Sequence, residues 1–163
     1  MMLKSLLLFF LSLLFSGLIS YAYSQKTEEK LKQLTADADV IITGKVSGQS
    51  SGWNADKTRI FTQATLKVDE YLKGNNNGNS VVVTYPGGEV GGIGELYTHM
   101  PKFANDEDVL VFLKKDEKGF KVSDGEEGKI KIIKVEKTGD KTTSSKIPVS
   151  YLKMQIKNYL KKN

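Results

Sequence analysis

The chain contains no cysteine, one histidine and only three prolines among its 163 residues. The lack of cysteine excludes disulfide bonds, thiolate catalysis, a lipoprotein anchor and cysteine–zinc sites. Arg59 is the only arginine, and lysine lacks the bidentate guanidinium fork with which proteins read bases and phosphates. We therefore expect no metal, no cofactor and no nucleic-acid partner.

The first 24 residues have the layout of a secretory signal peptide. Lys4 precedes the apolar run Leu6–Phe15, and Ala22-Tyr23-Ser24 places small residues at positions −3 and −1 of a cut before Gln25. This pattern predicts a protein that is secreted or periplasmic and makes no membrane contact after cleavage. An uncleaved anchor is the alternative, although serines and a glycine interrupt the apolar stretch that would span the bilayer.

The rest of the chain is dominated by strand patterns. Arg59–Leu72 alternates apolar and polar residues, Val40–Val46 is rich in β-branched residues, and the polar segment Ser47–Thr58 between them is expected to be a loop. Further strands are predicted at Ser80–Tyr85, Asp108–Leu113, Gly119–Ser123 and Lys129–Val135. Five or six short strands of this kind are typical of an antiparallel barrel.

Helices are expected at both ends of the mature chain. Thr27–Leu34 starts with an N-cap residue and two glutamates, and Pro148 suits the first turn of a final helix. One apolar stripe of that final helix consists of Val149, Leu152, Ile156, Tyr159 and Leu160. The stripe is expected to cover an open edge or end of the barrel; recruitment of a partner or a membrane is the alternative.

These patterns define an α+β fold class that is mainly β. We expect a small antiparallel barrel over residues 25–137, with a short N-terminal helix. A polar linker and a C-terminal amphipathic helix packed on the barrel are expected over residues 138–163. The domain is expected to be a monomer.

Several short sequences resemble a known family. The segments ADADVIITGKV, TLKVDEYLKG, VVVTYPGG, PKF and DVLVFLKK resemble secreted bacterial domains of poorly known function. Their order is also similar to the netrin-like module of tissue inhibitors of metalloproteinases, over roughly residues 28–133. The resemblance implies an OB-type barrel of five strands. Those inhibitors chelate zinc through a free N-terminal cysteine, so that mechanism has no matching residue here.

A glycine cluster follows the strand Ser80–Tyr85. Residues 86–94 hold five of the fifteen glycines, which predicts backbone with φ > 0 or close approach to another segment. Together with Trp53 and His99, this loop supplies the candidate binding residues. They are Trp53, Pro86, Gly87, Gly88, Glu89, Gly91, Gly92, Gly94 and His99.

Trp53 stands out in a polar segment. It either folds back over the end of the barrel or remains exposed as an anchor for a partner or a sugar. His99 has no second histidine nearby in the sequence and is expected to pack or hydrogen-bond locally.

Other motifs fit ordinary structure better than chemistry. Residues 48–52 match G-x-S-x-G, but that motif needs a strand-to-helix turn in a parallel sheet. The acidic clusters at 105–108 and 124–127 could hold calcium, yet neither has EF-hand spacing, and turns favour these residues. Residues 114–163 carry fourteen lysines against seven acids, which indicates a solvated basic face.

No catalytic residue is assigned, because the sequence shows no paired acid and base. We expect a secreted, non-enzymatic binding module for a protein or a glycan outside the cytoplasm. The alternative is an extracellular protease inhibitor that acts through a loop or an edge strand, without zinc chelation.

Cleavage before Gln25 would remove Lys4 and lower the net charge from +5 to +4. The intact mass of the exported protein should match a chain that begins at Gln25. A membrane-bound product that retains Leu6–Phe15 would instead identify an anchor.

Overall fold

The computed structural model describes residues 27–75, 78–117 and 119–162. The signal peptide or anchor expected over residues 1–24 lies outside these described residues. A compact unit that begins at Leu34 contains all of the strands and the C-terminal helix. Among the described helices, none has the length and the apolar character needed to span a bilayer.

Residues 27–37 are helical, which confirms the N-terminal helix and extends it beyond Leu34. The remaining elements are β1 (Val40–Trp53), β2 (Ile60–Lys73), β3 (Ser80–Pro86), β4 (Gly88–Val90), β5 (Ile93–Glu95), β6 (Asp108–Asp116), β7 (Gly119–Val122), the 3-10 turn η1 (Gly125–Gly128), β8 (Lys129–Lys134), β9 (Lys141–Thr143) and α2 (Val149–Lys162). The protein is thus mainly β, as the alternation of residues predicts.

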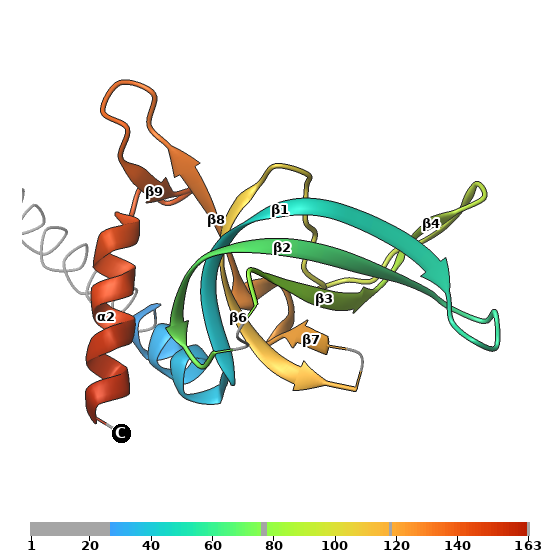
Figure 1. The fold of residues 1–163 in the computed structure, drawn as a ribbon, viewed down its shortest axis with the longest axis horizontal. Helices are drawn as coiled ribbons and strands as arrows, with labels where there is room; N and C mark the ends of the chain where they lie inside the picture. The colour runs from blue at the N-terminus through green and yellow to red at the C-terminus, as the bar shows by residue number, and fades with distance from the viewer. Residues whose placement is uncertain (1–26, 76–77, 118, 163) are drawn as a thin grey trace, which may run out of the picture. The chain divides into compact units, whose positions relative to one another are not determined.

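The strand pairings of the large sheet return to their starting strand. β1 pairs with β2, β2 with β3, β3 with β7, β7 with β6, and β6 again with β1 (Figure 1). Four of these junctions are antiparallel, and the fifth is a single parallel pair, Val83 with Phe120. The sheet is therefore mixed, and the antiparallel arrangement expected from the sequence is found in part. Five strands in a ring cannot all run opposite to both neighbours, because the number is odd.

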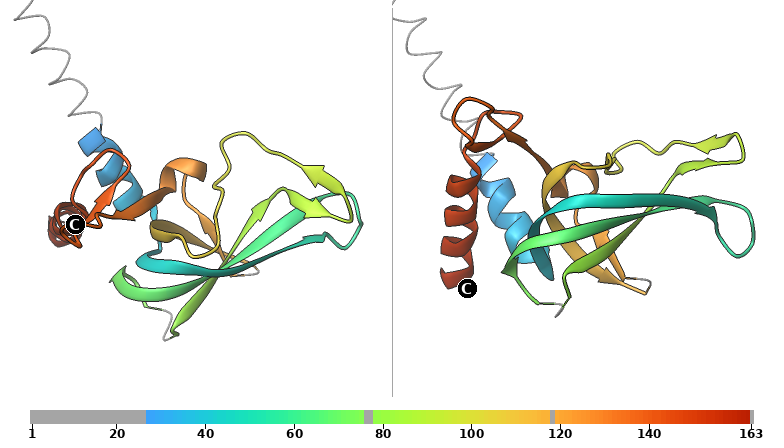
Figure 2. Two further views of the ribbon diagram at one scale, coloured as in Figure 1. Left: turned by 90° about the horizontal axis from the view of Figure 1, so that it is seen from above. Right: turned by 45° about the horizontal axis from the view of Figure 1, so that its top comes forward.

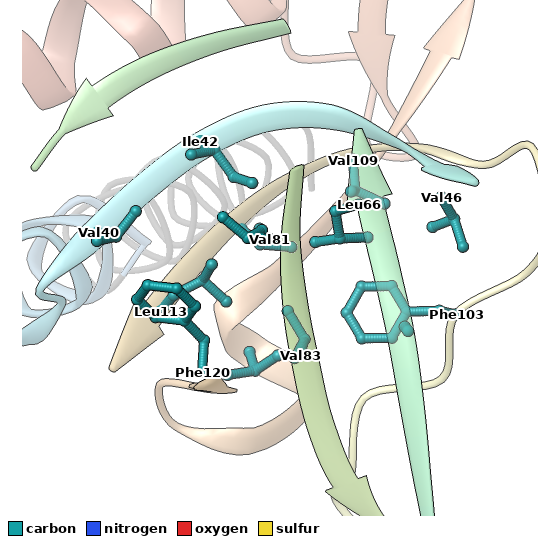
Figure 3. Close-up of a cluster of buried hydrophobic side chains, with 13 residues drawn as sticks. Val40, Ile42, Val46, Leu66, Val81, Val83, Phe103, Val109, Leu113 and Phe120 are labelled. Atoms are coloured by element: carbon teal, nitrogen blue, oxygen red, sulfur yellow. The ribbon is translucent and has the colours of Figure 1, made fainter. Parts of the chain in front are cut away.

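The hydrophobic core lies inside this ring. Figure 3 shows side chains from β1, β2, β3 and β6 directed toward one another, with Phe103 from a loop among them. Ile42, Leu66, Val83 and Leu113 have no exposed surface. Each such side chain contributes on the order of 2 kcal/mol by leaving water, so the alternating apolar residues of these strands specify the closed arrangement.

β1 bends as it runs along β2. Its register against β2 shifts between Ile41 and Ile42, between Thr43 and Gly44, and between Val46 and Gly48. Bulges of this kind bend a strand and increase its twist. As a result, the first part of β1 pairs with β6, whereas its second part continues beyond β6 along β2 alone (Figure 1).

Two segments expected to be loops contain strands. Ser47–Trp53 belongs to β1 and not to a loop, because Ser50 and Ser51 pair with Gln63 and Thr62 of β2. The linker after residue 138 contains β9, which pairs with β8. Both segments have a weak local β-propensity. They become strands because they pair with β2 and with β8, respectively.

α2 buries the predicted apolar stripe in part. Leu152 and Ile156 are buried, and the helix is also joined to β2 by an ion pair. Lys153 donates to Glu70 Oε2 at 2.7 Å, and Lys157 donates to Glu70 Oε1 at 3.1 Å. The hydrogen bond from Lys153, supported by Lys157, lowers the pKa of the Glu70 carboxyl below its usual 4.5. Burial raises this pKa, but by less.

The stability that Glu70 contributes should depend on pH. Because the pKa of its carboxyl is lower in the folded state, the contribution is present above the usual value of 4.5 and disappears as pH falls through the folded value. Glu70→Gln should therefore lower Tm at neutral pH but make little difference at about pH 2. Thermal unfolding followed by circular dichroism measures both, with Glu89→Gln as an exposed control. An equal Tm gap at the two pH values would contradict the ion-pair role.

Candidate binding groove and neighbouring clefts

The glycine cluster forms a two-stranded hairpin and not an irregular loop. β4 pairs with β5, with Val90 opposite Ile93, and Gly91 and Gly92 make the turn with φ of 60° and 80°. Two consecutive residues with positive φ are what a tight hairpin turn requires. After β5 the chain arches away from the sheet and descends into β6, as the left view of Figure 2 shows. We call residues 96–107 the returning segment.

Gly87 and Gly88 place this hairpin close to the β1–β2 ribbon. Their φ values are 100° and 130°, as the sequence predicts for this cluster. A Cβ on Gly88 would collide with Ser51 Oγ of β1 and with Thr62 Oγ1 of β2. Thr62 Oγ1 also donates to the Gly87 carbonyl at 2.6 Å. The glycines are thus needed both for their conformation and for the short distance to the ribbon.

Hydrogen bonds fix the end of the hairpin to the start of β2. The Glu95 carboxylate accepts the Ile60 N–H at 3.1 Å and the Tyr97 hydroxyl at 3.0 Å. Arg59 Nη1 donates to the Tyr97 hydroxyl at 3.3 Å, and its guanidinium lies 5.9 Å from the centre of the Tyr97 ring. These contacts hold the first residues of the returning segment before any partner is present.

A groove of about 640 Å³ lies between the second part of β1 and the returning segment. We call it the hairpin groove. It is lined by Gln49, Ser50, Ser51, Thr62, Tyr85, Pro86, Gly87, Gly88, Glu89, Gly94, Glu95, Leu96, Tyr97, Met100, Pro101, Lys102 and Phe103. Its walls combine main-chain polar groups with aromatic and apolar side chains, which is the usual composition of a binding site.

One end of the hairpin groove is held by Tyr85. Its ring packs against Phe103 at a centroid distance of 5.6 Å, and its hydroxyl donates to Gln49 Oε1 at 2.9 Å. Gln49 Nε2 in turn donates to Asn105 Oδ1 at 3.4 Å. Burial raises the pKa of the Tyr85 phenol above its usual 10.0, so the hydroxyl remains a donor at physiological pH.

Trp53 lies at a neighbouring cleft of about 450 Å³, which we call the Trp53 cleft. It is also lined by Phe61, Gln63, Thr84, Asp116 and Glu117. Trp53 is 37% exposed, so its side chain is partly packed and partly available. The two clefts share Ser50 and Ser51, but no residue of the glycine hairpin lines the Trp53 cleft.

His99 lines a third depression, which shares several residues of the returning segment with the hairpin groove. It has φ of 60°, its side chain is 85% exposed, and its Nδ1 is 3.5 Å from Glu126 Oε1. The Glu126 N–H donates to the His99 carbonyl at 2.9 Å, so the local contact expected for this histidine exists. Within the described part of the chain, no three histidine, aspartate or glutamate side chains are grouped to hold a metal ion.

The structure therefore divides the residues predicted from the sequence among several places. The hairpin groove includes Pro86, Gly87, Gly88, Glu89 and Gly94; Gly91 and Gly92 form the hairpin turn; Trp53 and His99 line other depressions. Sequence reasoning missed Gln49, Ser51, Leu96 and Tyr97. Leu96 and Tyr97 could have been predicted, because they are apolar and aromatic residues directly after the glycine cluster. Gln49 and Ser51 could not, because the segment Ser47–Thr58 was expected to be a loop.

The sequence matches no protein-family model, and no curated protein is similar enough to be a relative. Proposals about function therefore depend on the geometry of these surfaces.

Gly88→Ala should destabilise the domain by about 1–3 kcal/mol, because the position combines positive φ with a collision at Ser51 and Thr62. Gly94→Ala is the matched control on the same hairpin. A Cβ there would meet only the Gly88 carbonyl, at 3.9 Å, so stability should change by less than about 0.5 kcal/mol. Urea unfolding measures both. Equal stability of the two variants would show that the hairpin is not held against the ribbon.

Proposed function

We propose that this domain is a non-enzymatic binding module whose partner, a protein, enters the hairpin groove. The observation that carries the proposal is the preorganised wall of the groove. Glu95, Tyr97 and Arg59 fix the returning segment, so ordering it costs little when a partner binds. Leu96, next in sequence to Glu95, is 77% exposed at the groove, and an exposed large apolar side chain at a concave surface favours a protein partner.

We further propose that the ring of five strands is an OB-type barrel. That architecture is a five-stranded Greek-key barrel, and the order β1-β2-β3-β7-β6 with the return to β1 supports it. The same order supports the resemblance to netrin-like modules. An OB-type barrel carries many functions, so the fold favours a ligand-binding role without specifying the ligand.

The absence of catalysis is also part of this proposal. Two carboxylates of the hairpin and the returning segment already accept strong donors: Glu95 accepts from Ile60 and Tyr97, and Glu107 pairs with Lys129 at 2.7 Å, whereas Glu89 is exposed on the rim of the groove. Carboxylates used in this way maintain structure and are poorly placed to act as a general base. We place the protein outside the cytoplasm, secreted or periplasmic, because residues 1–24 have the layout of a signal peptide.

Inhibition of an extracellular protease is a second candidate, favoured by the β4–β5 hairpin. Ile93 is 56% exposed near the hairpin turn, where it could enter an active-site cleft of a protease. In that case the hairpin tip would be the contact surface and the groove would not. The two candidates therefore predict different sensitive residues.

Leu96→Asp and Ile93→Asp distinguish the two functions. Both residues are exposed, so neither charge should change Tm much. If the partner occupies the hairpin groove, Leu96→Asp should reduce its capture from the native extracellular fraction by at least about tenfold, because a desolvated carboxylate costs more than 1.4 kcal/mol. Ile93→Asp should capture the partner normally. Pull-down onto immobilised domain, quantified by mass spectrometry, measures both variants.

The reverse pattern would support inhibition through the hairpin tip. If only Ile93→Asp loses capture and the wild-type domain inhibits a protease, the contact surface is the hairpin tip and not the hairpin groove. Normal capture by both variants would contradict both proposals.

A further inference from the structure

One edge of β1 changes its environment halfway along the strand. Val40–Lys45 pairs with β6, and Val46 still exchanges backbone hydrogen bonds with Glu107 and Asp106, at 2.9 Å each. Beyond Val46 the returning segment leaves the edge, and no backbone hydrogen bond on this side is found for 47–53 within the described part of the chain. The second part of β1 is therefore an open sheet edge.

The register of β1 against β2 shows which backbone groups face that edge. The Asn54 N–H donates to the Arg59 carbonyl at 2.8 Å, and from there the pairing continues unbroken toward Gly48. Bonded and non-bonded pairs alternate along an antiparallel ladder, so the pair next to Asn54 and Arg59 is non-bonded. Ile60 belongs to that next pair, and its carbonyl indeed accepts from Gly87 on the opposite side at 2.8 Å.

The same alternation assigns the rest of the edge. Gln49, Ser51 and Trp53 belong to non-bonded pairs, so their N–H and C=O groups point away from β2. The close approach of Ser51 Oγ and Thr62 Oγ1, 2.9 Å apart, agrees with a non-bonded pair, in which facing side chains lie nearest. Three residues thus present a row of donors and acceptors at the spacing of a β-ladder.

This row of unpaired groups borders the hairpin groove at Gln49 and Ser51, and its end at Trp53 lies at the neighbouring Trp53 cleft. Gln49 and Ser51 line one wall, and Tyr97, Met100 and Pro101 line the wall formed by the returning segment. A strand laid along β1 would hydrogen-bond to the edge and direct alternate side chains toward these apolar residues.

We propose that the hairpin groove binds an extended polypeptide segment, which adds to β1 as one more strand. This inference rests on the proposed function, because it identifies the chemistry of the partner at the same groove. The incoming strand continues the interface of β6 with β1 and so runs antiparallel to β1, from Trp53 toward Gln49. An open edge of five residues accommodates about 17 Å of extended chain.

Two charged residues on the rim indicate the polarity of that segment. Lys102 adjoins Phe103 at the Gln49 end of the groove, and Glu89 adjoins Gly88 at the Ser51 end. Both side chains are exposed, and within the described residues neither forms an ion pair. An antiparallel segment that fits has a basic residue near its N-terminus, an acidic residue near its C-terminus and apolar residues at alternate positions between them.

The probe for this site is a display library of random seven-residue peptides, selected on immobilised wild-type domain. The selected peptides should show the charge order and alternation described above. In hydrogen-exchange NMR, a bound peptide should slow exchange of the Gln49, Ser51 and Trp53 amides. The Ser50 and Gly52 amides already face β2 and should change little.

Ser51→Pro tests the edge directly. It removes an N–H that points into the groove and leaves the β1–β2 ladder intact, so proline should be tolerated there as on other edges. Peptide affinity should fall by about tenfold or more, the usual consequence of a lost hydrogen bond and a blocked strand. Ser51→Ala separates the two contributions, because it keeps the N–H and removes only the hydroxyl; it should weaken peptide binding much less than Ser51→Pro does.

A modified peptide gives the same test without changing the protein. Methylation of the peptide nitrogen that faces the Ser51 carbonyl should weaken binding about as much as Ser51→Pro, and methylation of the adjacent nitrogen should not. This measurement decides the matter even if Ser51→Pro fails to fold.

Strand addition is wrong if no library peptide binds, or if selected peptides bind without protecting the edge amides or tolerate methylation at both positions. Protection that appears in the free protein and rises with its concentration would identify a second copy of the chain as the occupant, which also overturns the proposal. In any of these cases the binding module stands if Leu96→Asp still abolishes partner capture. It fails as well if that variant captures normally.

Discussion

The antiparallel pairing of β1 with β2 is the constraint on which the other elements depend. Each strand has 14 residues and is longer than β3 or β6, which pair with the two sides of this ribbon. One ribbon can therefore serve two purposes. Its first part closes the ring with β6 and surrounds the core, and its second part projects beyond the ring. The bulges in β1 allow this change because they bend the strand, and its pairing with β2 resumes after each of them.

The projecting part of the ribbon and the glycine hairpin fit each other through small residues. Ser51 and Thr62 present short side chains, and Gly88 presents none, so the two segments approach closely. Larger residues in either segment would push the hairpin away from the ribbon. This would break the hydrogen bonds from Thr62 Oγ1 to the Gly87 carbonyl and from the Gly87 N–H to the Ile60 carbonyl. The position of the hairpin is therefore a property of both segments, and the shape of the hairpin groove follows from it.

The proposed binding surface follows from the same geometry. The ring supplies a rigid scaffold, and the hairpin and returning segment supply a wall that Glu95 and Tyr97 hold in place. Between them, main-chain groups of β1 have no backbone hydrogen-bond partner among the described residues. Natural sheets commonly cover or distort such edges, because an open edge invites pairing with another chain. In the proposed binding mode, this open edge accepts one extended segment within the hairpin groove.

Local patterns in the sequence were sufficient for the elements that they stabilise directly. The alternation in β2 and the Pro148 start of α2 reflect interactions within a few residues, and the glycines at 87 and 88 do have positive φ. The second part of β1 could not be found in this way, because glycine and serine have low β-propensity and become a strand only through pairing with β2. The hairpin groove also depended on tertiary structure, since Ser51 and Tyr97 come from distant segments. The sequence by itself determined both helices, the glycine turn and the strands with a clear apolar alternation. Only tertiary pairing decided that the second part of β1 and β9 are strands and which surfaces remain open, because that depends on contacts between segments that no local pattern records.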